Sequence, residues 1–385
     1  MITLIQDWLQ SFWQPFHALR YVSVRAVIAT ALAFLVAVRL GKPMIAKLRR
    51  AGVGEHAALS DSAEVAKMYA AAQKTGTPTM GGVFWVAAVL FATLLLADPS
   101  ELMVVNAAVL LVGMGVIGFL DDFIKWKRDG GRDGLSRTAK FLPSVLLTIY
   151  VASVLWFTAE NTGRPEIASI YLPAVKTAEN SFVNLLEWGF WGFAVFVAIE
   201  AFIVLACSHA VNVTDGLDGL AAGSALPAFA ALTFALIAVD TESLAEYWHL
   251  PLIPGAGELA VMGGAVIGAT AGFLWYNANP AQIFLGDSGS LPMGALLGYF
   301  ALVSKQELAL PLLALVFVIE VTSSFIQIAG FKITRKLTGT GRRLLPVAPI
   351  HHYWQRTIPE QQLVVRFWLL ASIGAALGVL TMKLR

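Results

Sequence analysis

Acidic, amide and imidazole side chains recur in four short polar segments of this 385-residue chain, each beside a long apolar run. The acids and amides are Asp121, Asp122, Asn212, Asp215, Asp218, Asn277 and Asp287, and the last segment carries His351 and His352. Carboxylate and amide oxygens are ligands that Mg²⁺ prefers, and basic side chains bind phosphates. This composition favours metal-assisted phosphoryl transfer.

The acidic pair Asp121 and Asp122 directly follows an apolar run, with Lys125 one helical turn further on. Adjacent carboxylates repel each other unless a cation lies between them, and the C-terminal end of a helix also disfavours acids. We therefore expect a bound Mg²⁺, a general base, or compensation by the basic residues that follow.

The segment VNVTDGLDGLAAG (211–223) spaces Asn212, Asp215 and Asp218 by three residues. On a helix this spacing predicts that the three polar side chains share one face. The glycines between them predict a second face for close packing. The alternative is a purely structural helix, with one side chain capping its start and the glycines packing against a neighbouring helix. Such a cap would use only one of the two acids and leave the other unexplained.

Asp287 lies between two glycines in NANPAQIFLGDSGS (277–290), just ahead of another apolar run. Phe284 suits stacking on a flat ring, or equally an anchor at a membrane interface. The segment KTGTPTMGG (74–82), which includes Lys74 and Thr79, is similar in composition to a phosphate-binding loop, although it lacks the Walker A pattern.

The imidazole pair His351 and His352 suits phosphate contact better than zinc, because the other candidate ligands are oxygens. Glu200 and Glu320 lie inside apolar runs, and each is either functional or part of a helix–helix hydrogen bond. The sequence has no H-E-x-x-H, CxxC or G-x-S-x-G pattern, so zinc-hydrolase and serine-hydrolase interpretations lack support.

The composition indicates a polytopic membrane protein: 57% of residues are hydrophobic, 14% are charged, and the mean hydropathy is +0.71. Soluble domains carry about 25% charged residues. We predict an all-α, single-domain protein over residues 1–385, with about ten transmembrane helices. The expected spans are 22–40, 80–97, 103–120, 141–158, 187–207, 219–239, 258–275, 289–304, 309–330 and 364–382. The net charge of +2 gives no field that would attract nucleic acid.

Lysine and arginine are distributed unevenly between alternate loops. One set of loops (41–79, 121–140, 208–218, 276–288 and 331–363) holds about eighteen of them, and the other set with both termini holds about six. Basic loops face the cytoplasm. This places both termini outside and all the polar segments at the cytoplasmic face, where a lipid and a cytoplasmic phosphate compound can meet.

The chain resembles the phospho-N-acetylmuramoyl-pentapeptide transferase family of polyprenyl-phosphate sugar-1-phosphate transferases. The matching segments are GTPTMGG (76–82), GFLDDFIK (118–125), VNVTDGLDGLAAG (211–223), WYNANPAQIFLGDSGS (275–290) and APIHH (348–352). The resemblance implies transfer of phospho-MurNAc-pentapeptide from UDP-MurNAc-pentapeptide to undecaprenyl phosphate. The products would be lipid I and UMP, in peptidoglycan synthesis at the bacterial inner (cytoplasmic) membrane, with Mg²⁺ as cofactor.

The resemblance also implies roles for individual residues. Asp287 would be the Mg²⁺ ligand, and Asp121 the base for the lipid phosphate, with Asp122 beside it. The other implied catalytic residues are Asp215, His351 and His352. The implied substrate-binding residues are Lys74, Thr79, Lys125, Asn212, Gly216, Leu217, Asp218, Asn277 and Phe284, most of them for uridine.

Three departures from the family pattern stand out: Tyr353 and Gln355 replace a third histidine and a glutamate, and the stretches 60–73 and 332–347 are atypical. One alternative is a UDP-GlcNAc:polyprenyl-phosphate transferase, which uses UDP-GlcNAc as the donor and a polyprenyl phosphate as the acceptor, since such relatives share the acidic motifs. Another is a secondary transporter, which would place its acids at the bilayer midplane. The sequence does not determine the oligomeric state, and a homodimer remains open.

Overall fold

The computed structural model describes residues 14–54, 76–128, 134–171 and 182–384. All ten predicted apolar runs form helices. These are α2 (Val22–Arg50), α4 (Gly82–Leu96), α5 (Leu102–Lys127), α6 (Arg137–Thr162), α7 (Gly189–Thr214), α8 (Leu220–Asp240), α10 (Ala256–Asn277), α11 (Asp287–Val303), α13 (Leu315–Thr338) and α15 (Glu360–Lys383). Within the described part, eight helices are long and apolar enough to cross a membrane, while α4 and α11 are shorter. An all-α polytopic fold is confirmed, and the count of ten spans stays a prediction.

Shorter elements connect these helices. They are η1 (Gln14–Arg20), η3 (Pro165–Ala168), β1 (Ser169–Tyr171), β2 (Phe182–Asn184), η4 (Leu185–Trp188), α9 (Glu242–Trp248), α12 (Leu310–Leu313) and α14 (Ile350–Gln355). The two strands form an antiparallel hairpin that pairs Ile170 with Val183. It lies between the predicted spans 141–158 and 187–207.

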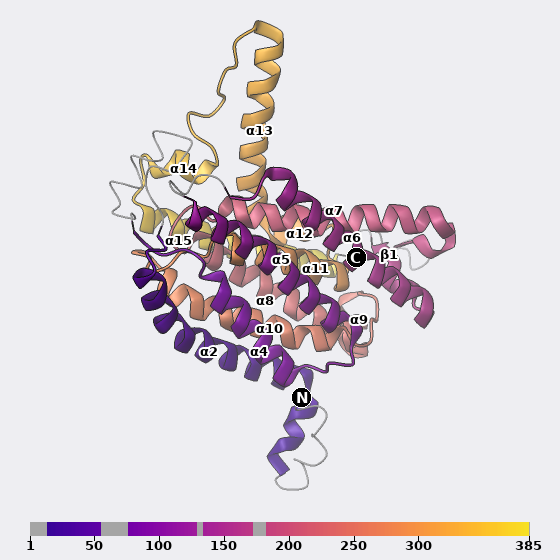
Figure 1. The fold of residues 1–385 in the computed structure, drawn as a ribbon. Helices are drawn as coiled ribbons and strands as arrows, with labels where there is room; N and C mark the ends of the chain where they lie inside the picture. Colours follow the sequence, from indigo (N-terminus) through magenta and orange to yellow (C-terminus); the bar gives the residue numbers. More distant parts are fainter. Residues whose placement is uncertain (1–13, 55–75, 129–133, 172–181, 385) are drawn as a thin grey trace.

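Two helices, α10 and α11, lie at the centre of the fold (Figure 1). Helix α10 packs on α2 and α8, and α11 packs on α5 and α7. Small residues allow this close approach: a Cβ at Gly268 would overlap the carbonyl of Thr30 on α2, and one at Gly294 would overlap Cys207 on α7. In lipid, small residues at such crossings let the helix backbones pack tightly.

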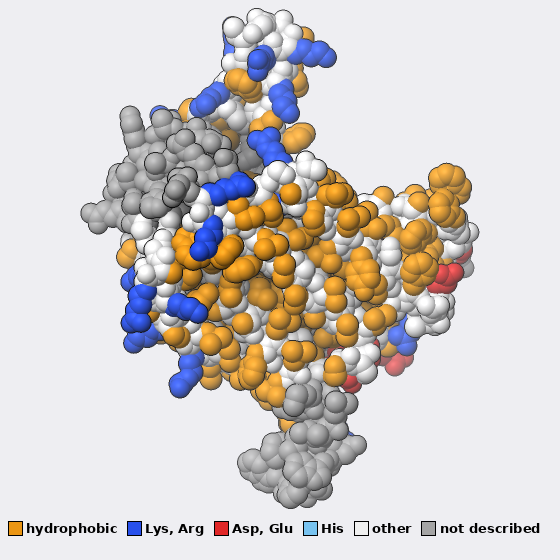
Figure 2. All heavy atoms as spheres, in the orientation of Figure 1, with side chains coloured by type: hydrophobic (Ala, Val, Ile, Leu, Met, Phe, Trp, Pro, Cys, Tyr) orange, Lys and Arg blue, Asp and Glu red, His pale blue; other side chains and the backbone are white. Residues whose placement is uncertain are grey.

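Apolar side chains cover much of the outer surface. Figure 2 shows a broad hydrophobic belt, with Lys and Arg at one edge and Asp and Glu at the opposite edge. Phe141, Phe202 and Leu369, for example, are at least half exposed. A surface of this kind suits contact with lipid rather than water. The basic edge includes the last turns of α2 and α5, so it is the end that the charge pattern assigns to the cytoplasm.

The ninth predicted span, 309–330, differs from the structure. It forms two helices, α12 and α13, and α13 continues eight residues beyond the prediction to Thr338. Gly330 does not interrupt the helix, which continues to Gly339, where the left-handed conformation (φ +76°) ends it. The distal part of α13 therefore carries basic residues expected in a loop, and it projects from the helical body (Figure 1).

Candidate active site at the basic end

Three carboxylates from two helices meet at the basic end of the fold. Asp121 and Asp122 lie at the end of α5, and Asp287 begins α11. Their oxygens lie within 4.8 Å of one another, and no other such group of potential ligands occurs in the described residues. Asp121 and Asp122 are 2% and 3% exposed. Like charges this close and this buried require compensating cations.

Two lysines provide that compensation. Lys125 lies 2.6 Å from the Oδ2 of Asp121 and 3.4 Å from the Oδ2 of Asp287. Lys140, in the first turn of α6, pairs with Asp287 and lies 3.5 Å from Asp121. The sequence interpretation missed Lys140, although its place in a basic segment at the start of a span was a usable signal. The two ammonium groups also lie where they can contact phosphates.

The neighbours Asp121 and Asp122 face different groups. The Oδ1 of Asp121 accepts a hydrogen bond from the amide of Leu135 at 2.8 Å. The oxygens of Asp122 instead accept the backbone N–H groups of Asp287 (3.2 Å) and Ser288 (3.0 Å). Only Asp121 therefore faces the lysines directly, and Asp122 faces the start of α11.

Asn212 joins this group from α7. Its Nδ2 donates to the Oδ1 of Asp287 at 2.7 Å and to the Oγ of Ser290 at 2.8 Å. The prediction of one shared face for Asn212, Asp215 and Asp218 is wrong, because α7 ends at Thr214. A turn follows, in which Gly219 has φ +78° before α8 begins. Asp215 caps α7 and is not one of the three clustered carboxylates.

Asp218 instead organises a second polar group. Its Oδ2 accepts from the Nδ2 of Asn279 (2.9 Å) and the amide of Ala281 (3.0 Å). Nearby, Asn277 accepts from the amide of Gly219 and donates to the carbonyl of Ile283, both within 2.9 Å. These bonds hold the turn before α8 against the loop before α11, and Leu217 is buried in an adjoining apolar cluster.

The GTPTMGG segment packs against the loop that carries Asp287. The amides of Gly81 and Gly82 donate to the carbonyls of Phe284 and Leu285, each at 2.9 Å. These two backbone N–H groups already donate to protein carbonyls. They therefore do not act as phosphate donors, although the composition of the segment is similar to that of a phosphate-binding loop. Phe284 and Thr79 are half-buried beside this contact. Lys74 and the stretch 60–73 lie outside the described residues.

The histidine pair lies on α14, behind the turn that contains Gly216. His351 is fully buried, and its Nδ1 lies 2.8 Å from the Oε2 of Glu320 on α13. Its Nε2 faces Gly216, where a Cβ would overlap the ring. Among the described residues this Nε2 has no hydrogen-bond partner. Glu320 is thus a helix–helix hydrogen-bond acceptor that holds a candidate site residue.

The unusual Gln355 links His352 to the Asp218 group. The Nδ1 of His352 lies 3.2 Å from the Oε1 of Gln355, whose Nε2 donates to Glu360 at 3.1 Å. The other oxygen of Glu360 accepts the amide of Asp218 at 3.0 Å. A glutamate at position 355 would place two carboxylates together, so the amide is the compatible residue. Tyr353 points outward and is 38% exposed.

The donor set fits a magnesium ion. It consists of carboxylate oxygens with no thiolate or imidazole among the clustered ligands, and Mg²⁺ is typically held by one or two carboxylates together with substrate phosphates. Asp287 and Asp121 are the two acids whose charges the lysines balance. Asp287, at the start of α11, is the residue that would hold the ion.

Charges at the opposite end have a structural role. Arg25 of α2 pairs with Glu258 of α10 through both guanidinium nitrogens and also donates to the carbonyl of Leu96 at 3.0 Å. Burial, together with the nearby Glu258 and Asp98, raises the pKa of Glu101. The contacts of Arg25 join the ends of α2, α4 and α10 that lie opposite the acidic cluster.

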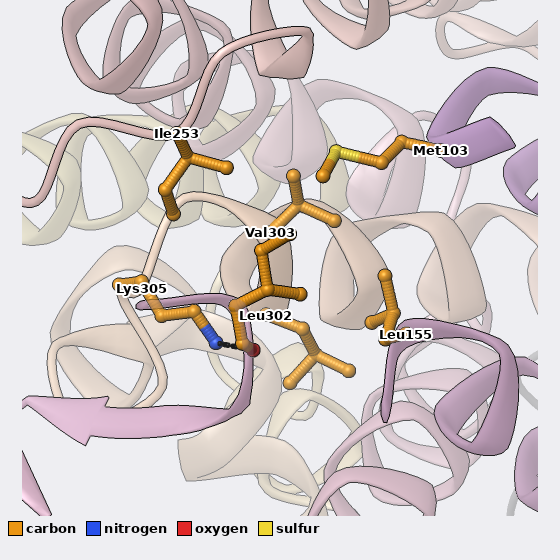
Figure 3. Close-up of a pocket in the computed structure, with 7 residues that line it drawn as sticks. Met103, Leu155, Ile253, Leu302, Val303 and Lys305 are labelled. Carbon is orange, nitrogen blue, oxygen red and sulfur yellow. Dashed lines mark hydrogen bonds between the residues drawn. The ribbon is translucent and has the colours of Figure 1, made fainter. Parts of the chain in front are cut away.

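A small apolar space lies at the far end of α11 (Figure 3). Met103, Leu155, Ile253 and Val303 line it, and Lys305 at its edge donates to the carbonyl of Ile167 at 2.8 Å. It holds no water-sized volume. Because α11 has 17 residues, this space lies roughly 25 Å from Asp287. It is a packing defect and not part of the candidate site.

Comparison with known proteins gives a consistent assignment. A family model described as glycosyl transferase family 4 matches residues 102–305. Proteins named phospho-N-acetylmuramoyl-pentapeptide-transferase match the full chain. One from Desulfatibacillum aliphaticivorans is 38% identical over 98% of each chain, and one from Salinibacter ruber is 36% identical over all of each. Another, from Porphyromonas gingivalis, is 35% identical, also over both full lengths. The chain therefore belongs to glycosyl transferase family 4, among the phospho-N-acetylmuramoyl-pentapeptide transferases.

Proposed function

We propose that this protein transfers phospho-MurNAc-pentapeptide from UDP-MurNAc-pentapeptide to undecaprenyl phosphate. A phosphate oxygen of the lipid bonds to the sugar-bearing phosphorus, the bond from that phosphorus to the bridging oxygen breaks, and UMP leaves. The products are UMP and lipid I, a precursor of peptidoglycan. The observation that carries the proposal is the full-length similarity to enzymes of that name, joined to a buried acid–lysine cluster at one end of an apolar helical body.

Asp287 and Asp121 have different roles, the first at the diphosphate of the donor and the second at the phosphate of the lipid. Asp287, with its Oδ1 held by Asn212, would hold Mg²⁺, which would supply positive charge against the diphosphate and its UMP leaving group. Asp121 accepts the last proton of the lipid phosphate or orients it. Lys125 and Lys140, which lie beside both acids, supply further positive charge for the incoming phosphates.

The remaining predicted residues bind the donor. The half-buried ring of Phe284 stacks on the uracil, and Gly216, Leu217, Asp218 and Asn277 shape that pocket through the turn before α8. Lys74 and Thr79 also bind the donor, and Asp215 assists catalysis. His351 and His352 contact the diphosphate or the sugar from α14.

The protein works in the bacterial cytoplasmic membrane as a single domain with both termini outside and the acids inside. The lysine and arginine pattern of the loops and the hydrophobic belt of Figure 2 support this orientation. A homodimer fits these assignments as well as a monomer does, and no nucleic acid takes part.

The test is UMP release by the purified protein with Mg²⁺ and undecaprenyl phosphate. UDP-MurNAc-pentapeptide and UDP-GlcNAc are supplied in separate reactions. We expect release only with the former, and a loss of more than tenfold in Asp287→Asn, which corresponds to at least about 1.4 kcal/mol. Glu242→Gln, an exposed acid on α9, is the matched control and should remain active. Release from UDP-GlcNAc alone would contradict the substrate assignment.

A further inference from the structure

The start of α11 has no cap within its own chain segment. The first N–H groups of any helix lack partners inside the helix. At α11 the N-cap position is Gly286, which has no side chain to accept them. The helix begins with Asp287 itself. Any movement of this first turn therefore also moves the proposed metal ligand.

Asp122 supplies the missing cap from another helix. It lies on α5, 165 residues earlier in the chain, and its two oxygens accept the N–H groups of Asp287 and Ser288. The carboxylate is 3% exposed, so water does not screen it. A negative charge at a helix N-terminus is favourable, and hydrogen bonds from N–H groups to a charged acceptor are the stronger kind.

Close packing of the two helices makes this contact possible. A Cβ at Gly118, one turn before Asp122, would overlap the carbonyl of Asp287. A Cβ at Gly286 would lie 2.5 Å from the Oδ2 of Asp122 and 2.8 Å from the Oγ1 of Thr79. Glycine at both positions therefore lets the carboxylate reach the backbone of α11, and Gly286 also adopts φ +71°.

The two adjacent acids are thereby separated in function. Successive residues on a helix point about 100° apart, so Asp121 faces the two ammonium groups while Asp122 faces the backbone of α11. This also explains how neighbouring carboxylates coexist at the end of α5: one is balanced by lysines, and the other by the N-terminus of a second helix.

We propose that Asp122 is a positioning residue that caps α11 and thereby fixes the carboxylate of Asp287. Both oxygens of Asp122 accept backbone N–H groups of α11, so in this proposal Asp122 acts on Asp287 through the backbone of that helix. The metal-binding consequence rests on the role proposed for Asp287. The capping itself does not depend on that role.

The test compares Asp122→Asn with Asp121→Asn, a matched loss of one charge from the same helix end. Amide hydrogen exchange is followed by mass spectrometry in peptides that cover 283–290. Mn²⁺ binding is measured by electron paramagnetic resonance, without substrate. For Asp122→Asn we expect at least tenfold faster exchange at Asp287 and Ser288, and a 10- to 100-fold weaker Mn²⁺ affinity, as for other residues that orient ligands. Asp121→Asn should leave this exchange unchanged.

Transfer kinetics give the second measurement. If Asp122 positions Asp287, the activity of Asp122→Asn should recover to within a few-fold of wild type as Mn²⁺ is raised. A kcat deficit that persists at saturating Mn²⁺, with normal amide protection, would show that Asp122 acts on the reacting groups and would overturn the proposal. If Asp122→Asn does not fold, amide exchange in the wild-type protein tests the proposed cap instead. Its amides at 287 and 288 must exchange more slowly than those at the start of α15, where Pro359 gives no side-chain cap.

Discussion

Replacing Glu320 by glutamine is expected to slow transfer by disturbing His351. The carboxylate of Glu320 is fully buried and accepts from two groups of His351, the Nδ1 at 2.8 Å and the backbone amide at 3.4 Å. Ser323 provides a third hydrogen bond between α13 and α14, since its Oγ accepts from the amide of Ile350 at 3.0 Å. Together these bonds fasten α14 to α13 and present the Nε2 of His351 towards the turn at Gly216.

The magnitude follows from the type of bond that is lost. A hydrogen bond to a charged group contributes about 1.5–3 kcal/mol, against about 0.5–1.5 kcal/mol for a neutral one. Glutamine keeps an acceptor oxygen but loses the charge, so the orientation of His351 should weaken by about 1–1.5 kcal/mol. If that weakening appears fully in the barrier, kcat falls by about five- to thirteenfold. Glu320→Ala also leaves a buried imidazole N–H unpaired, which costs about 1–3 kcal/mol more.

The assay is UMP release at saturating substrates, with the melting temperature as a check of folding. Glu200→Gln is the matched control, since Glu200 is also a fully buried glutamate inside a span, on α7, and none of the described site residues accepts or donates a hydrogen bond to it. Its kcat should change by less than about twofold. His351→Gln and the double variant with Glu320→Gln should be equally slow, because coupled residues are not additive. Full activity of Glu320→Gln, or additive losses in the double variant, would refute the role of Glu320.

Three further predictions test other parts of the assignment. Asp121→Asn should lose activity, and the loss should become smaller as the pH rises from about 6 to 9. The lipid phosphate, with a second pKa of about 6, then loses its last proton without a base. A deficit that does not change with pH would contradict the role of Asp121 as the base. In a Cys207→Ser background, cysteine at Thr340 should react with a membrane-impermeant label only from the cytoplasmic side and cysteine at Asn161 only from outside, and the reverse would invert the topology. Gly82→Ala should lower the melting temperature, by a destabilisation of about 1–3 kcal/mol, because its Cβ would overlap the backbone of Gly289; an unchanged melting temperature would contradict the tight packing of α4 on α11.

The sequence by itself determined the helices and the end of the fold at which the acids gather. Each of the ten apolar runs is helical, the ninth as α12 followed by α13, since a backbone in lipid must satisfy its own hydrogen bonds. The polar segments fall between alternate runs, so antiparallel packing of successive helices brings them to one end. One boundary that the sequence predicted is the start of α2 at Val22, whereas the end of α13 at Thr338 lies beyond the prediction.

Only the tertiary structure decided which of these polar groups meet. Lys140 joins Asp121 and Asp287 because the start of α6 packs beside the end of α5. The spacing of Asn212 and Asp218 predicted one face, yet α7 ends between them at Thr214, so Asn212 contacts Asp287 and Asp218 contacts Asn279. A repeat of three or four residues defines a face only while the helix continues.

The different roles of Asp121 and Asp122 have the same origin. Their order along the chain predicts only that they repel. Which of them faces the lysines depends on the rotation of α5 about its axis. That rotation is set by the contact of Gly118 with α11, a helix more than 160 residues further along the chain. Contacts between distant segments of this kind follow from the packing of complete helices, and no local pattern of residues encodes them.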